Sequence, residues 1–138
     1  MFFTNKNILL GVTGGIAAYK AAEIIRNFKK EGANVRVVMT ESAKEFITPL
    51  TLQAISGNEI HDSLLDVKAE SAMGHIELAK WADILLIAPC TAETMAKITH
   101  GRADDLLGSV ILASKANIYL APAMNMNMWL DESCLLYT

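Results

Sequence analysis

The chain has 138 residues, of which 52% are hydrophobic and 20% are charged, and its formal net charge is -3. This length fits one domain, and the lysines and arginines are too evenly spread to form a basic stripe for nucleic acid. No apolar run approaches the roughly 18 residues of a membrane span, and the start of the chain lacks a signal-peptide pattern, so we expect one cytoplasmic domain over residues 1–138 that binds neither nucleic acid nor membrane.

The first predicted unit is a strand, a helix and a second strand. Asn7–Val12 is a short apolar run that ends at a glycine-containing turn, which predicts a buried strand. Apolar residues recur with helical spacing over Ile16–Lys30, and Gly32 is a stop signal for that helix. The β-branched residues of Asn34–Thr40 predict the next strand. Such units form parallel strand pairs.

The rest of the chain continues the alternation of helices and strands. Short helical pieces are expected over residues 43–57, around Pro49 and up to Gly57, whereas residues 58–74 carry no readable pattern. The further expectations are a strand over Ile84–Ala88 ended by Pro89, a helix over Thr91–Thr99 capped by Gly101, a helix over Asp104–Lys115, and a strand over Ile118–Ala121 ended by Pro122. The alternation predicts an α/β fold, a three-layer doubly wound parallel sheet of the Rossmann-like or flavodoxin-like kind.

Ligands of open parallel sheets bind outside the carboxyl ends of the strands. The loops that follow the four predicted strands are residues 13–15, 40–42, 89–94 and 122–125, and all of them contain small, hydroxyl or amide residues. We therefore expect the functional site to be formed by these four loops.

The turn Gly14-Gly15 lies between a strand and a helix, where the backbone can approach a phosphate near the helix N-terminus. The pattern is neither the dinucleotide fingerprint nor a P-loop, which disfavours ATP or GTP hydrolysis. A tight turn without a ligand is the alternative interpretation. In the next loop the hydroxyls of Thr40 and Ser42 suit a flavin phosphate or ribityl chain, although Glu41 between them keeps a nicotinamide cofactor open. Ordinary helix capping explains that loop equally well.

The loop after the third predicted strand contains Thr91 and Thr94, which either cap the following helix or present its N–H groups to an anion. Cys90 in this loop is interpreted as a small buried residue, and no sequence feature indicates an activated thiol. The second cysteine, Cys134, is far away in the sequence, so neither a disulfide framework nor a zinc site is expected.

The remaining candidate functional residues are three histidines and a methionine-rich segment. His75 precedes the segment that leads into the third predicted strand, whereas His61 and His100 lie beside charged or turn residues and are expected at the surface. In the segment 122–129 an asparagine, Asn125, can donate to a substrate carboxylate, and methionines adapt to irregular ligand surfaces. From composition alone, a core role for these methionines is the stronger alternative.

Several of these motifs together resemble one family, the homo-oligomeric flavin-containing cysteine decarboxylases. They are Gly-Gly-Ile-Ala-Ala-Tyr-Lys at 14–20, His75, the loop 89–94, Gly-x-Ala-Asp-Asp-Leu-Leu at 101–107 and Pro-x-Met-Asn-x-x-Met-Trp at 122–129. The last motif is the most specific, because it resembles the substrate-recognition signature of the family. The closest similarity is to the members that decarboxylate 4'-phosphopantothenoyl-cysteine to 4'-phosphopantetheine in coenzyme A biosynthesis.

The resemblance implies a cofactor, FMN, and assigns roles to residues of this chain. FMN is expected against Gly14, Gly15, Ile16, Thr40, Ser42, Phe46, Pro89, Cys90, Thr91 and Thr94. The substrate is expected against Ala123, Met124, Asn125 and Met128, with Asn125 on its carboxylate and His75 as the catalytic base. In the family, FMN oxidises the substrate cysteine to a thioaldehyde-like species that loses carbon dioxide, and the flavin then reduces the enethiol.

The resemblance also implies partners: a homo-oligomer, either a trimer or a multiple of trimers, with FMN near the subunit boundary, and a possible fused phosphopantothenate-cysteine ligase domain. The chain departs from the family pattern at Glu93, where an asparagine is common, and at its end, before the Gly-Gly-Cys flap that donates a proton in the reductive step. Cys134 does not match that flap, so we expect the domain to be truncated before it. Flavin prenylation, peptidyl-cysteine decarboxylation and a non-catalytic flavin-binding regulatory subunit are the alternative functions.

Overall fold

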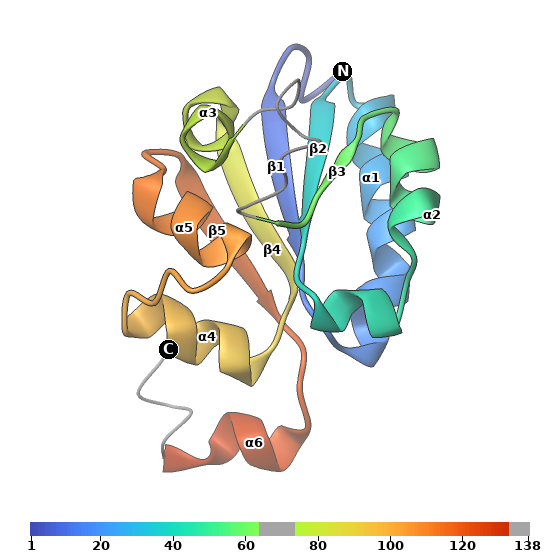
Figure 1. Ribbon diagram of the computed structural model, residues 1–138. Coiled ribbons are helices and arrows are strands. Elements are labelled where there is room, and N and C mark those ends of the chain that lie inside the picture. The colour runs from blue at the N-terminus through green and yellow to red at the C-terminus, as the bar shows by residue number, and fades with distance from the viewer. Residues whose placement is uncertain (64–73, 133–138) are drawn as a thin grey trace.

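The computed structural model describes residues 1–63 and 74–132. A parallel sheet of five strands in the order β3-β2-β1-β4-β5 forms its centre (Figure 1). In chain order the strands are β1 (Asn7–Val12), β2 (Asn34–Met39), β3 (Ile60–His61), β4 (Ile84–Cys90) and β5 (Asn117–Pro122). The α/β fold predicted from the sequence is confirmed, and the strand order is that of the first five strands of a Rossmann fold.

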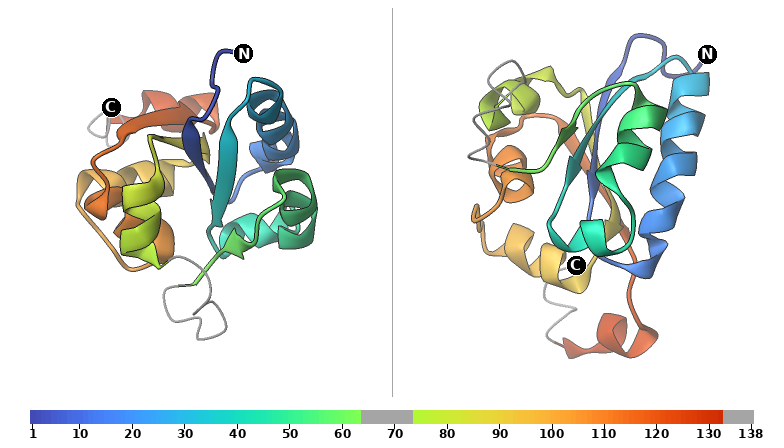
Figure 2. Two further views of the ribbon diagram at one scale, coloured as in Figure 1. Left: turned by 90° about the horizontal axis from the view of Figure 1, so that it is seen from above. Right: turned by 45° about the vertical axis from the view of Figure 1, so that its right-hand side comes forward.

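Helices cover both faces of this sheet, as the view from above shows (Figure 2). One face carries η1 (Ile16–Lys20), α1 (Ala21–Lys30), η2 (Ser42–Glu45) and α2 (Pro49–Ser56). The other face carries α3 (His75–Trp81), α4 (Ala92–Thr99) and α5 (Leu106–Ala113), whereas α6 (Met126–Leu130) lies beyond the carboxyl end of β5. The predicted three layers are therefore present.

The apolar strands are explained by burial on both faces. In β1, Ile8 and Leu10 pack into the core beneath α1 and α2, whereas Leu9 packs into the second core beneath α3 and α5. All three side chains are fully buried. Because both faces of the central strands are covered, their sequences are continuously apolar rather than alternating.

Most predicted elements differ from the observed ones by one or two residues at an end, and three differences are of another kind. The helix expected over Ile16–Lys30 begins with the 3-10 turn η1 and becomes α-helical at Ala21. Pro89 does not end its strand, because β4 continues to Cys90 through a cis Ala88–Pro89 peptide. The five-residue helix α6 lies in the methionine-rich segment, where no helix was expected.

The short edge strand β3 lies in the region without a readable pattern and corrects one expectation. His61 was expected at the surface, yet its side chain is only 5% exposed. The reason is that β3 pairs with β2, with His61 opposite Val38, whose side chain belongs to the core beneath α3 and α5. His100 follows α4 and is exposed, as predicted.

The methionines of α6 do not belong to the core. Met126 is 71% exposed and Met128 is 48% exposed, so the interpretation of this segment as core is wrong for these two residues. Met124 packs partly buried against the core beneath α5. Among the residues that the structure describes, no helix is long and apolar enough to cross a membrane.

Candidate functional site

The loops after β1 and β4 meet at the point where the strand order reverses. From β1 the chain proceeds outward to β2 and β3 and then returns to β4 on the other side of β1. Thr13, directly after β1, donates its hydroxyl hydrogen bond to the carbonyl of Pro89, and the N–H of Thr91 donates to the Thr13 oxygen over 3.2 Å. Such a switch point is where open α/β sheets bind ligands.

A cavity of about 1030 Å³ lies at this carboxyl edge. This volume is at the upper end of the range of small-molecule sites, roughly 300–1,000 Å³. Most of the residues predicted for the site line it: Gly14, Gly15, Ile16, Thr40, Ser42, Thr91, Thr94, Ala123, Met124, Asn125 and Met128. The four loops expected to form the site therefore each contribute to one cavity.

Gly14 is the point where the loops after β1 and β2 touch. A Cβ atom at this position would overlap the hydroxyl oxygen of Ser42 and lie 2.6 Å from its Cβ and 2.9 Å from its carbonyl carbon. At Gly15 the nearest atom would be the methyl group of Thr91 at 3.8 Å, which is ordinary contact. Gly14 is therefore required by close approach, whereas Gly15 has room for a side chain.

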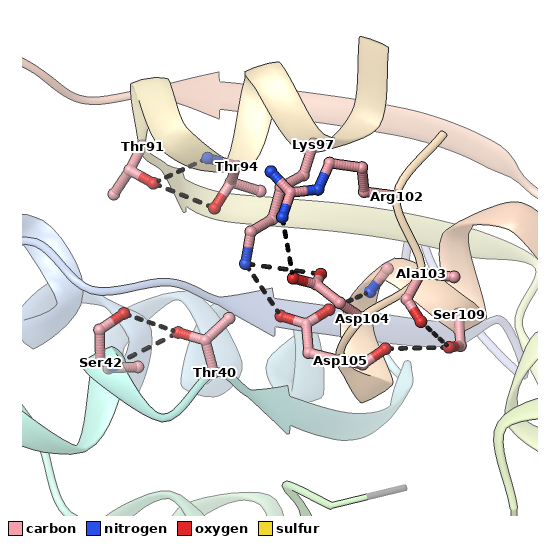
Figure 3. A network of polar contacts seen from close by, with 12 residues as sticks. Thr40, Ser42, Thr91, Thr94, Lys97, Arg102, Ala103, Asp104, Asp105 and Ser109 are labelled. Atoms are coloured by element: carbon pink, nitrogen blue, oxygen red, sulfur yellow. Dashed lines mark hydrogen bonds and ion pairs between the residues drawn. The ribbon is translucent and has the colours of Figure 1, made fainter. Parts of the chain in front are cut away.

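The hydroxyls after β2 face the cavity as a pair. The side-chain oxygens of Thr40 and Ser42 lie 3.3 Å apart, and the N–H of Ala43 donates to the Thr40 oxygen over 3.3 Å. Figure 3 shows this pair on the opposite side of the site from Thr91 and Thr94. Capping and ligand binding are compatible here, because the hydroxyls that close the turn also line the cavity.

Thr91 caps α4 while it lines the same cavity. Its side-chain oxygen accepts a hydrogen bond from the N–H of Thr94 over 3.2 Å and lies 3.0 Å from the Thr94 hydroxyl (Figure 3). Such a cap stabilises a helix by about 1 kcal/mol. The start of α4 therefore presents hydroxyls and positively polarised N–H groups to the cavity.

Asn125 brings the methionine-rich segment to the cavity. Its side-chain oxygen accepts from the N–H of Asn127 over 2.8 Å, at the start of α6. This bond fixes the amide plane, and the Nδ2 donors of the side chain are the groups that a carboxylate would accept from. The segment is attached to β4 through the N–H of Ala123, which donates to the carbonyl of Cys90 over 3.1 Å.

Three residues predicted to contact FMN do not line the cavity. Pro89 and Cys90 are buried beneath it, where their carbonyls hold Thr13 and Ala123. Burial raises the pKa of the Cys90 thiol to about 12, so the thiol is protonated at neutral pH. Phe46 follows η2 and is half exposed. Cys134 lies outside the described residues.

His75 is not brought together with Asn125 within one chain. It is the first residue of α3 and does not line the cavity. Figure 1 shows α3 beside α5 and away from the carboxyl edge of the sheet, because α3 leads into the beginning of β4. The structure of a single chain therefore separates the two residues that the resemblance assigned to the reacting face.

Sequence reasoning missed a charged cluster in the cavity wall. Lys97 of α4 lines the cavity together with Arg102, Asp104 and Asp105, which lie between α4 and α5. The motif at 101–107 was part of the resemblance and could have pointed to these residues. These residues lie in α4 and in the connection from α4 to α5, whereas the rule for parallel sheets points only to the loops that directly follow strands.

The fold and the site define an α/β protein with a phosphate-compatible cavity at the switch point, and the comparisons place it in a family. The family described as Flavoprotein matches residues 3–134, and the chain belongs to this family.

Among curated proteins, the chain is 59% identical over 129 residues to the coenzyme A biosynthesis bifunctional protein CoaBC of Haemophilus influenzae and 54% identical over 129 residues to CoaBC of Escherichia coli K12. In both cases the match covers 94% of this chain and 32% of the relative. The chain therefore spans about a third of the length of these relatives.

Solved structures agree with this assignment. The FMN-dependent cysteine decarboxylase SpaF is similar with a TM-score of 0.90 at 31% identity, over 98% of this chain and 78% of that one. A PPC decarboxylase variant complexed with pantothenoylaminoethenethiol has a TM-score of 0.77 at 33% identity, over 96% and 76% of the two chains.

Proposed function

We propose that this domain binds FMN and decarboxylates 4'-phosphopantothenoyl-cysteine to 4'-phosphopantetheine in coenzyme A biosynthesis. The observation that carries the proposal is that Asn125 lines the same cavity as Gly14 and Ser42. A donor for a substrate carboxylate thus shares one cavity with a glycine and hydroxyl cradle for a phosphate. The identity of 54–59% to CoaBC proteins supports this choice of substrate.

The cavity wall fits a phosphorylated flavin. Gly14 packs closely on Ser42, and the hydroxyl-bearing residues Thr40 and Ser42 line the cavity beside it, as suits a phosphate. Ile16, Met124 and Met128 add apolar surface, which suits a flavin ring. Gly14, Thr40, Ser42 and Thr91 would hold the cofactor, which when bound supplies the acceptor for two electrons from the substrate cysteine.

Asn125 orients the substrate in this proposal. Its amide is held by the N–H of Asn127, so its donors are fixed before the substrate arrives, and little ordering remains to be done on binding. A carboxylate held by Asn125 is the group that leaves as carbon dioxide. Met124 and Met128 on either side of it can adapt to the rest of the substrate.

The separation of His75 from the cavity leads to a proposal about assembly. We infer that the domain works as a homo-oligomer, a trimer or a multiple of trimers, in which His75 of one copy reaches the cavity of another. Its supports are the position of His75 at the start of α3 and the exposed apolar surface of β5 and α6. In this arrangement His75 accepts the proton from the substrate while Asn125 of the other copy holds the carboxylate.

Subunit complementation tests this arrangement. His75→Asn and Asn125→Asp are each expected to abolish carbon dioxide release but to retain FMN. When the two inactive variants are co-expressed and purified together, mixed oligomers contain cavities with both residues intact, so part of the activity should return. If the mixture stays as inactive as either variant alone, His75 and Asn125 do not act across a subunit boundary.

Product identification tests the reaction itself. The domain is incubated with 4'-phosphopantothenoyl-cysteine, with a peptide that ends in cysteine, and with dimethylallyl phosphate plus reduced FMN, and the products are identified by mass spectrometry. We expect loss of carbon dioxide from the first compound. Turnover of only the peptide or prenylation of the flavin would instead assign one of the alternative enzymes, and flavin binding without turnover would assign a regulatory subunit.

We also propose, as the bifunctional relatives indicate, that this domain acts in the cytoplasm beside a phosphopantothenate-cysteine ligase domain of the same polypeptide. The mass of the gene product tests this arrangement. A product near the length of the CoaBC relatives supports it, and a product of one domain with full activity contradicts it.

A further inference from the structure

A cluster of four charged side chains forms the cavity wall opposite Thr40 and Ser42 (Figure 3). The ammonium group of Lys97 lies 3.7 Å from a carboxylate oxygen of Asp104 and 3.9 Å from one of Asp105. Arg102 lies 3.4 Å from the other oxygen of Asp104. Two cations and two carboxylates thus share one surface of the cavity.

The backbone fixes these charges in place. The N–H of Arg102 donates to the carbonyl of Lys97 over 3.0 Å, which folds the connection back onto α4. Asp105 caps α5 by accepting from the N–H of Gly108 over 2.8 Å. A Cβ at Gly108 would lie 2.5 Å from the carbonyl of Arg102, so the connection packs tightly against α5.

Lys97 is the least exposed member of the cluster. Its side chain is 25% exposed, compared with 57% for Arg102 and 49% for Asp104. Charges removed from water are less screened, and they act over longer distances. A ligand in the cavity therefore experiences the field of Lys97 more strongly than that of an ordinary surface lysine.

We propose that the cluster of Lys97, Asp104 and Asp105 sets the reduction potential of the flavin bound in this cavity. The inference rests on the proposed binding of FMN. Uptake of two electrons and one proton adds one negative charge to a flavin, so a nearby positive charge favours reduction and a negative charge opposes it. Lys97 favours the electron transfer from the substrate cysteine, and the two aspartates limit that effect.

The proposal can be tested in both directions, because Lys97 carries a positive charge and Asp105 carries a negative one. Lys97→Met removes a positive charge and is expected to shift the midpoint potential to a more negative value. Asp105→Asn removes a negative charge and is expected to shift it to a more positive value. The asparagine can still accept from the N–H of Gly108, so the helix cap remains.

Anaerobic reductive titration against a reference dye measures these potentials without any substrate. Lys30→Met serves as a matched control, because Lys30 lies at the end of α1, is exposed and does not line the cavity. Its potential should equal that of the wild type. The absorption spectrum recorded before titration tests whether the wild type binds flavin. A wild type without a flavin spectrum would contradict the proposed FMN binding, whereas the potentials of the variants test only the role of the charged cluster.

Opposite shifts for Lys97→Met and Asp105→Asn support the proposal. Unchanged potentials, or shifts of both variants in the same direction, would overturn it, because a cluster with a purely structural role changes thermal stability without this sign pattern. If Lys97→Met does not retain flavin, Asp105→Asn alone decides by the direction of its shift.

Discussion

Cys90 does not line the cavity, but its backbone holds a residue that does. The side chain is fully buried beneath the loop that caps α4, and its backbone carbonyl anchors the segment of Ala123. Since burial raises the pKa of its thiol to about 12, very little thiolate is present at neutral pH. The loop sequence alone allowed a buried small residue, and the resemblance added a contact with FMN; the structure shows the residue buried and outside the cavity lining.

Cys90 should therefore resist alkylation in the folded protein. We expect iodoacetamide at pH 8 to leave the Cys90 peptide unmodified, and to modify it fully once the protein is unfolded in guanidinium chloride. Peptide mass mapping distinguishes Cys90 from Cys134, which serves as the second thiol of the same sample. Rapid modification of Cys90 in the folded state would show that its thiol is accessible to solvent and not buried.

At the scale of elements, the edge strand β3 contains a buried histidine, His61. Among the described residues, the Nε2 atom of His61 has no hydrogen-bond partner. Burial lowers the pKa of His61 below its usual value of 6.5, and the positive charge of Arg36 lowers it further, against the smaller opposing effects of Glu59 and Asp62. The imidazole is therefore neutral in the folded protein near neutral pH.

The stability of the domain should consequently fall in acid. Below about pH 6.5 the unfolded state takes up a proton at His61 that the folded state does not bind, so stability is present above this pH and is lost as the pH falls towards the folded pKa. Each unit of depression in the pKa corresponds to about 1.4 kcal/mol.

Urea unfolding at pH 7 and pH 5 measures this effect. His61→Leu should lose less stability between the two pH values than the wild type does, whereas His100→Gln, at an exposed position, should keep the dependence of the wild type. Equal acid sensitivity of His61→Leu and the wild type would exclude His61 as its source.

The elements that were predicted correctly are those whose own residues show a hydrophobic pattern typical of a strand or a helix. The run Asn7–Val12 is buried on both faces and was recognised as a strand with the observed limits. By contrast, β3 has two residues and no apolar run, and it depends on contacts with β2, including the hydrogen bond from Asn58 to the carbonyl of Val35 over 2.8 Å. Such tertiary contacts leave no local signal.

The residues of the candidate site also fall into those that the sequence predicted and those that it did not. Gly14, Ser42 and Thr91 were found because the carboxyl ends of parallel strands meet at one edge. Lys97 was missed because it lies in the last turn of α4, where a lysine is expected to be a solvated surface residue. Its placement in the cavity depends on the tight connection to α5.

At the scale of the whole molecule, the apolar surface at one side of the sheet requires an explanation. Every residue of β5 is exposed, including Tyr119 at 54%. On α6, Leu130 is 60% exposed and Trp129 is 37% exposed. Apolar patches of this kind mark interaction surfaces in soluble proteins, which agrees with the proposed oligomer.

Charge placed on β5 should weaken that oligomer. We expect Tyr119→Glu to shift the domain from the proposed oligomer towards monomers in sedimentation velocity, because a carboxylate buried in an interface loses its hydration. Lys30→Glu on the exposed end of α1 is the control and should sediment as the wild type does. If Tyr119→Glu also sediments as the wild type does, β5 is not part of the interface.

FMN is proposed to bind in the cavity where Gly14 packs on Ser42, and substitution of the two neighbouring glycines tests this most directly. The measurement is the dissociation constant of FMN for the apoprotein, followed by quenching of flavin fluorescence, for the wild type, Gly14→Ala and Gly15→Ala. Circular dichroism and thermal unfolding check that each variant is folded.

Gly14→Ala must displace Ser42, so we expect its affinity to fall by at least about tenfold, which is about 1.4 kcal/mol. Gly15 has an extended backbone with φ of -158° and room for a Cβ, so Gly15→Ala should bind FMN nearly as the wild type does. Unchanged affinity in a folded Gly14→Ala variant would contradict the placement of FMN in this cavity.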